Sequence, residues 1–185
     1  MKKYILLLMI FLNACAFTQN SKFYRLQSLS QGKIVSNLKT SVGVEEVSIP
    51  RYVDRPQMVI FKPNTSELNI SEFHRWAEPL SFGLTRILAD DISLYLPNAL
   101  VKPQSYSMEN FNYTVTVEFN KFDAIMDAQA TLDAWWTIFK NTKAVARGRT
   151  TISHDVKGGY DGIVIEQSKL LSEMARQIAQ KISQL

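Results

Sequence analysis

Polar and apolar residues alternate along two stretches in the second half of the chain. Every second residue is apolar within residues 113–119 and again within residues 128–138. A period of two places the apolar side chains on one face, so each stretch is predicted to be a half-buried strand. Asn141 and Thr142 then provide the turn of a hairpin, and a third strand is expected through residues 144–148.

Shorter apolar runs in the first half predict further strands. They cover residues 23–26, 42–49 and 57–61, and Pro50 follows the second run. Ser71 is expected to cap a short helical turn, because a serine hydroxyl accepts hydrogen bonds from the free N–H groups at the start of a helix.

Two longer segments have the spacing of amphipathic helices. Apolar residues recur every three or four positions within residues 80–95 and again within residues 171–182. Pro79 suits the first turn of the earlier helix, and Pro97 ends it. Strands, a helix, a run of strands and a final helix predict an α+β fold in one domain over residues 22–185. We expect a two-layer sandwich, with a mixed or mostly antiparallel sheet and both helices on one face.

The first fifteen residues have the pattern of a bacterial export signal. Lys2 and Lys3 precede an apolar run of nine residues, 4–12. Crossing a membrane takes about 20 apolar residues, whereas a signal peptide needs a shorter run of this kind. Residues 12–15 (L-N-A-C) resemble the lipobox, in which a small residue precedes the cysteine that becomes lipidated.

The lipobox resemblance implies a diacylglycerol on the thiol of Cys15, with cleavage before this residue and acylation, for example with palmitate, of its new amine. Residues 1–14 would then be the signal peptide, and residues 15–21 the lipidated cysteine and a short tether. Ala16 stands where an aspartate favours inner-membrane retention, so the periplasmic face of the outer membrane is the expected location. The alternative is an ordinary secretory signal followed by a free thiol.

Composition narrows the class of protein. The chain has 185 residues, of which 46% are hydrophobic and 21% charged, which excludes a wholly disordered protein. Its net charge is +4, but loss of Lys2 and Lys3 leaves 19 basic against 17 acidic residues, or +2. A charge this small gives no reason to expect a nucleic-acid partner. The single cysteine excludes an intrachain disulfide and a cysteine-rich zinc site.

The sequence has no pattern that predicts a catalytic, cofactor or metal site. His74 and His154 are far apart, and neither has a His or Cys neighbour at metal-ligand spacing. Two carboxylate pairs occur, at residues 90–91 and at Asp123 with Asp127. We expect the first on the polar face of a helix and the second in a turn between strands, where solvation explains both. The chain is therefore predicted not to be an enzyme.

Two segments rich in aromatic, proline and charged residues are candidates for binding a partner. Aromatic residues and arginine are enriched at protein interfaces, although the same residues can also serve the fold. The candidate interface residues are Arg51, Tyr52, Asp54, Arg55, Pro56, Trp76, Glu78 and Pro79.

These segments carry a family resemblance. Residues 44–57 (V-E-E-V-S-I-P-R-Y-V-D-R-P-Q) and 76–80 (W-A-E-P-L) resemble the signatures of the PqiC-type members of the ABC-type transport auxiliary lipoprotein family, as do Leu132, Ala134 and Trp136. The resemblance implies a non-enzymatic lipoprotein of the outer membrane, facing the periplasm. It also implies a partner, an MCE-domain protein of a Pqi-like system that moves lipid between the membranes and supports their integrity. A homo-oligomeric ring is one arrangement that the resemblance allows.

Two other functions stay open at this point. The first is a lipid-binding carrier, which needs an apolar cavity of its own between the sheet and the helices. The second is a tethered regulator of a cell-wall enzyme, which needs a tether longer than residues 16–21, whose fully extended reach is roughly 20 Å.

Overall fold

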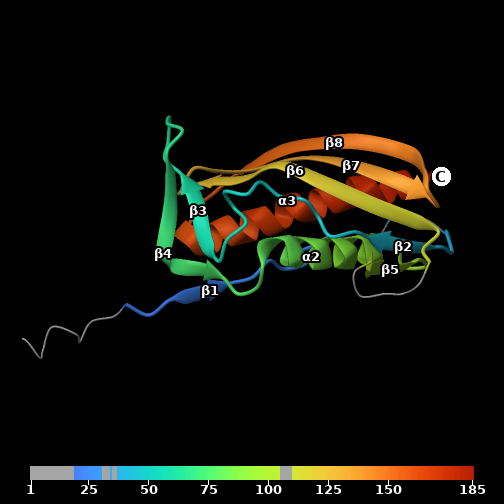
Figure 1. Ribbon diagram of the computed structural model, residues 1–185, viewed down its shortest axis with the longest axis horizontal. Helices are drawn as coiled ribbons and strands as arrows, with labels where there is room; N and C mark the ends of the chain where they lie inside the picture. The colour runs from blue at the N-terminus through green and yellow to red at the C-terminus, as the bar shows by residue number, and fades with distance from the viewer. Residues whose placement is uncertain (1–18, 31–33, 35–36, 105–109) are drawn as a thin grey trace, which may run out of the picture.

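A computed structural model describes residues 19–30, 34, 37–104 and 110–185 (Figure 1), so the predicted signal peptide and Cys15 lie outside the described residues. The described residues form eight strands and two helices. These are β1 (Lys22–Tyr24), β2 (Ser41–Val44), β3 (Gln57–Phe61), β4 (Leu68–Trp76), α2 (Leu80–Tyr95), β5 (Leu100–Pro103), β6 (Tyr113–Ile125), β7 (Gln129–Lys140), β8 (Lys143–Asp155) and α3 (Gly159–Ile182).

The strands form one mixed sheet organised around β6. The order is β1-β4-β3-β6-β2-β5, and β7 and β8 extend from the other edge of β6. β6 pairs with β7 along its whole length, antiparallel, whereas its opposite edge is shared by β2 at Val115 and by β3 at Ile125, both parallel. In Figure 1 the β3–β4 hairpin stands at one end of the sheet, steeply inclined to the long strands.

The alternating patterns decide which face of the long strands is buried. Tyr113, Val115, Val117 and Phe119 are all at most 5% exposed, as the period of two predicts. The apolar positions of β7 are likewise buried, and Asn141 forms the predicted turn with a positive φ of 53°. The predicted hairpin between β7 and β8 is confirmed.

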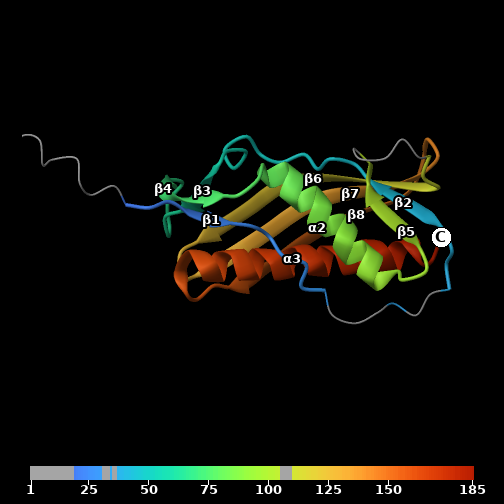
Figure 2. The same ribbon diagram turned by 90° about the horizontal axis from the view of Figure 1, so that it is seen from below.

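Both helices pack against the same face of the sheet, as Figure 2 shows. α2 buries Leu84, Leu88 and Ile92, and α3 buries its own apolar stripe. The two helices also contact each other, and the hydroxyl groups of Tyr95 and Ser172 lie 3.2 Å apart at this contact. The predicted α+β fold, with a mixed sheet and two helices on one face, is therefore confirmed.

Three local predictions are wrong, those for Ser71, for Asp91 and for Asp123, which lies within β6 and not in a turn. Ser71 lies in β4 and not in a helical turn. Its hydroxyl nevertheless accepts a hydrogen bond from the N–H of His74, at 3.0 Å, where β4 bulges away from the register of β3. The hydrogen bond expected at a helix cap is thus made at a strand bulge, because a serine hydroxyl can accept from the backbone N–H three residues later in either setting.

Asp91 is the second correction, since it is fully buried and does not lie on a polar helix face. Its carboxylate accepts a hydrogen bond from the hydroxyl of Ser28, a residue of the segment that leads from β1 across α2 and α3. Ser30 lies 2.9 Å from Ser172 and fastens the same segment to α3.

Within the described residues, neither helix is long and apolar enough to cross a membrane.

Candidate partner interface

The two candidate segments meet at one groove of about 340 Å³ between the end of β4 and the start of α2. The backbone N–H of Trp76 donates a 2.7 Å hydrogen bond to the carbonyl of Pro56, which joins the segments directly. The lining residues are Asp54, Arg55, Pro56, Trp76, Ala77, Glu78, Pro79 and Leu80.

A tight turn positions the first segment. The N–H of Val53 donates to the carbonyl of Pro50 at 3.1 Å, and the N–H of Arg55 donates to the carbonyl of Val53 at 2.9 Å. Val53 is 4% exposed and holds this turn against the core, which leaves Asp54 and Pro56 exposed on its outer side. Burial of a single side chain therefore fixes the direction of the neighbouring groove residues.

Burial of Trp76 positions the second segment. Its side chain is 8% exposed and belongs to the core, so it contributes to the wall of the groove and is not a free aromatic anchor. Ala77 and Pro79, on either side of Glu78, are exposed. Pro79 is the N-cap residue of α2, one position before the predicted first turn, and its fixed φ of −51° leads the chain into the helix.

Charged groups surround this apolar wall. Arg86, one and a half turns into α2, pairs with Glu78 at 2.5 Å and lies 3.9 Å from Asp90. Arg55 differs, because its Nε is buried and has no hydrogen-bond partner among the described residues. Because this atom is covered by the protein itself, it is not available to an incoming partner.

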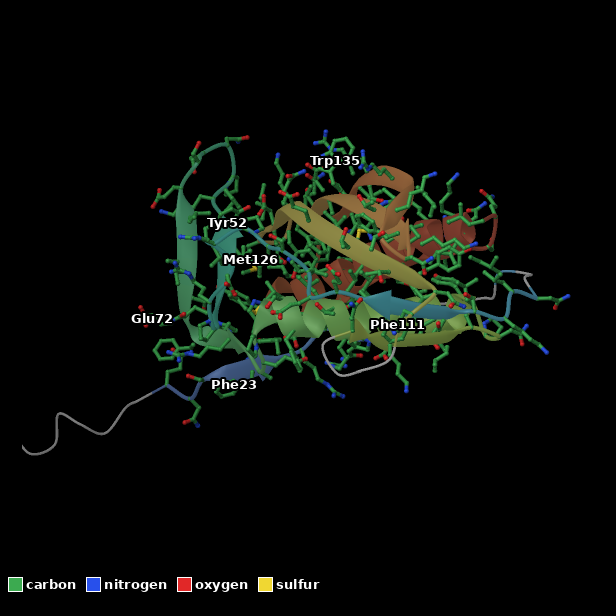
Figure 3. All side chains as sticks on the ribbon, turned by 45° about the vertical axis from the view of Figure 1, so that its right-hand side comes forward. Phe23, Tyr52, Glu72, Phe111, Met126 and Trp135 are labelled. Carbon is green, nitrogen blue, oxygen red and sulfur yellow. The ribbon has the colours of Figure 1, made fainter. Side chains whose placement is uncertain are left out.

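Tyr52 and Arg51 lie outside the groove lining. The hydroxyl of Tyr52 donates a 2.7 Å hydrogen bond to Asp123 of β6, and its ring packs edge-on against Phe61 of β3. Burial and the hydrogen bond to Asp123 raise the pKa of Tyr52 well above its usual range, and burial raises the pKa of the Asp123 carboxyl. Tyr52, labelled in Figure 3, therefore ties the loop to the sheet, while the neighbouring Arg51 is exposed.

The structure thus gathers six of the eight candidate residues and adds Arg86, which the sequence analysis did not name as a candidate. Ala77 and Leu80 lie in the same W-A-E-P-L segment and line the groove. Arg86 lies on α2 and pairs with Glu78, which precedes the helix, so no helical spacing could have indicated this contact.

The two histidines are held by neighbouring side chains. The ring of His74 stacks on Tyr160 at 3.8 Å between centroids, and its Nδ1 lies 3.0 Å from the hydroxyl of Ser71. His154 lies between Glu166 and Glu173, at 3.1 Å and 2.9 Å. Among the described residues, no group of three His, Cys, Asp or Glu side chains is arranged to hold a metal ion.

The groove lies beside the strand that begins the described domain. The N–H of Ala77 donates a 2.8 Å hydrogen bond to the carbonyl of Tyr24 in β1. β1 begins at Lys22, directly after the segment that the sequence predicts to be a membrane tether. A partner in the groove would consequently contact the end of the domain that is closest to the predicted anchor.

Solved structures share the whole fold. A crystal structure of an uncharacterized protein has a TM-score of 0.74 at 20% identity, covering 89% of this chain and 99% of that one. Protein XCC0632 from Xanthomonas campestris has a TM-score of 0.73 at 14% identity, covering 89% and 100%. At such low identities these likenesses establish the architecture alone. No curated protein sequence matches the chain.

A family profile covers most of the sequence. It is described as the ABC-type transport auxiliary lipoprotein component and matches residues 24–179. This range begins in β1, ends in the last turn of α3 and includes both segments of the groove. The chain therefore belongs to the ABC-type transport auxiliary lipoprotein family.

Proposed function

We propose that the chain is a periplasmic lipoprotein, anchored in the outer membrane, that serves as a docking subunit of an MCE-type, Pqi-like lipid transport system and so supports membrane integrity. The MCE-domain protein of that system would bind the groove beside β1. Family membership supports a role as an accessory of a transporter. The observation that carries the docking role is the gathering of six candidate interface residues around one groove.

The chemistry of the groove suits a protein partner. Pro56, Pro79 and Leu80 provide apolar surface, and Asp54 and Arg55 provide charge at its edge. Protein interfaces combine an apolar centre with a polar rim in this way.

Packing between the sheet and the helices favours docking over lipid carriage. Leu84 and Leu88 of α2, Leu171 of α3 and Ile138 of β7 have no exposed surface. A side chain that lined a cavity large enough for an acyl chain would have exposed surface inside it. The middle of the domain is therefore filled by its own side chains, and the described grooves are open to the outside.

The predicted anchor places the groove near the membrane. Residues 16–21 separate Cys15 from β1, a reach of roughly 20 Å when fully extended. This distance suits a dock on the outer membrane better than a regulator that must reach a cell-wall enzyme. Replacing Cys15 with alanine should move the protein from the outer-membrane fraction to the soluble periplasm, and continued membrane fractionation would contradict the anchor.

Site-directed photocrosslinking in intact cells tests the docking surface. A photoreactive residue at the exposed Ala77 should capture an MCE-domain protein, identified by mass spectrometry, because Ala77 lies inside the groove. The same residue at Val145, on the outer face of β8, is the matched control, since it is also exposed but lies far from the groove. Equal capture at both positions, or no MCE-domain protein at Ala77, would refute the proposal.

A groove variant provides an independent measurement. Ala77→Arg adds a long side chain to the groove without removing any contact of the core. It should reduce co-purification of the MCE-domain protein about tenfold or more, as expected when a central interface position is blocked. An unchanged thermal unfolding temperature would confirm that the loss is one of binding. Undiminished co-purification would show that the partner binds elsewhere.

A further inference from the structure

A second surface, next to the first strand, has a composition that docking in the groove does not explain. Phe23 of β1 is 66% exposed and Ile165 of α3 is 48% exposed, the former being the most exposed large apolar side chain described. Figure 3 shows Phe23 at the outer edge of the molecule, pointing away from the core. Together with Lys22, Arg25 and Gln27 they form what we call the β1–α3 patch.

The patch is concave and its backbone is fixed. A groove of about 410 Å³ runs between β1 and the first turns of α3, lined by Phe23, Arg25 and Ile165 among others. Tyr24 alternates with Phe23 and faces inward, with its ring 6.4 Å from that of Tyr160. Parallel pairing with β4 places Phe23 beside Arg75. The exposure of Phe23 therefore follows from the strand register and not from a loose terminus.

The charges around the patch are mostly basic. Lys22 and Arg25 are exposed on either side of Phe23, and Arg75 lies beside it on β4. Asp161, one turn before Ile165, is the acidic residue that lines the groove. An aromatic residue among basic ones is typical of surfaces that lie at a phospholipid headgroup layer, where the ring enters the interface and the cations meet phosphates.

Chain length limits how far this patch can be from the membrane. Phe23 follows Cys15 by eight residues, which span at most about 29 Å when fully extended. We infer that the β1–α3 patch binds the phospholipid headgroups of the membrane that holds the anchor, so that the domain lies on the bilayer in one orientation. This inference rests on the Cys15 anchor of the proposed function. In a single orientation of the domain, the partner groove beside Tyr24 would always face the same direction relative to the membrane.

Fluorescence quenching on the full-length lipidated protein tests the patch. Gln27, which lines the groove, is replaced with cysteine (Gln27→Cys) and labelled with bimane. This substitution leaves Phe23, Lys22 and Arg25 in place. The native cysteine does not compete, because its thiol is lipidated. The protein is reconstituted in vesicles of phosphatidylethanolamine and phosphatidylglycerol whose acyl chains are brominated close to the headgroup. Label at Val145 on the opposite side of the molecule is the matched control.

We expect bromolipid quenching at Gln27 to exceed that at Val145 by about threefold or more. Phe23→Ser should at least halve the quenching at Gln27. Lys22→Glu with Arg25→Glu should reduce it further, and 0.5 M NaCl should reproduce the effect of that charge reversal. These exposed substitutions leave the core untouched, so circular dichroism should be unchanged.

Each other result overturns the inference in a distinguishable way. Equal quenching at Gln27 and Val145 on protein that floats with the vesicles would show that the anchor is correct but the patch does not touch lipid. A blue-shifted label at Gln27 without bromolipid quenching would show that protein covers the patch. Failure to float would refute the anchor, and with it both the proposed function and the patch.

Discussion

Asp133 is a buried charge whose contacts predict a measurable contribution to stability. It lies on β7 and is 4% exposed. Its two oxygens accept hydrogen bonds from Nε and Nη2 of Arg149, each at 2.8 Å, and from the hydroxyl of Thr151 at 2.8 Å. Asn120 adds a longer bond of 3.3 Å. All these donors favour the ionised carboxylate, and those of Arg149 above all lower the pKa of Asp133 to about 2.

The size of the effect follows from that pKa. A fall from 3.8 to about 2 corresponds to about 2.5 kcal/mol, at about 1.4 kcal/mol per pKa unit. Water screens part of this, since the Arg149 side chain is 48% exposed, so we take about 1–2 kcal/mol. Asp133→Asn keeps the shape of the side chain but removes the charge. It should therefore lower the free energy of unfolding at pH 7 by about 1–2 kcal/mol.

Urea denaturation followed by circular dichroism, from pH 7 to pH 2, measures this difference. The pKa of Asp133 is lower in the folded than in the unfolded state. Its contribution is therefore complete above the unfolded value near 4 and disappears as pH falls through about 2. The unfolding free energies of the two proteins should converge at pH 2. Asp155→Asn, at the exposed end of β8, is the control and should change little. A difference that is independent of pH would refute the electrostatic explanation.

Two further substitutions probe the core. Burial raises the pKa of Asp91, so ionisation of this side chain is unfavourable in the folded state. In contrast to Asp133, its contribution to stability therefore rises as pH falls through that raised pKa. Asp91→Asn should remove this rise, as measured by urea denaturation over a series of pH values. In β8, a Cβ on Gly148 would lie 2.1 Å from the indole of Trp136, which is itself 8% exposed. Gly148→Ala should therefore destabilise the protein by about 1–3 kcal/mol, and an unchanged thermal unfolding temperature would show that the indole can move aside.

The sequence predicted the elements whose identity depends on neighbouring residues. The alternation of apolar residues along β6 and β7 predicts which side chains are buried. The apolar stripe of α2, which has a helical period, predicts the buried side chains of that helix. One face of each element needs a partner, so two helices on one face of a sheet followed directly. Periodicity therefore accounts for the layers of the fold, and the residue types at Asn141 and Thr142 account for the turn between β7 and β8.

Features that depend on distant residues were not predictable in this way. Asp91 looked solvated from its place after Asp90, but Ser28, 63 residues earlier, covers it. Ser71 looked like a helix cap because a bulged strand can use the same hydrogen bond. The residue type determines which hydrogen bonds a side chain can make, whereas the assembled fold determines which partner lies close enough to make them.

The same limit explains why the sequence did not show which of the candidate residues lie together. The segment at residues 50–56 is a single run in the sequence, but the fold divides its residues between two tasks. Tyr52 bonds to Asp123, 71 residues away, and secures the loop, whereas Asp54, Arg55 and Pro56 face the groove. A signature in this family can thus serve folding at one position and place a side chain at an exposed groove two positions later. Exposed groove residues such as Ala77, rather than the most distinctive residues of the signature, are consequently the positions at which docking can be tested without disturbing the fold.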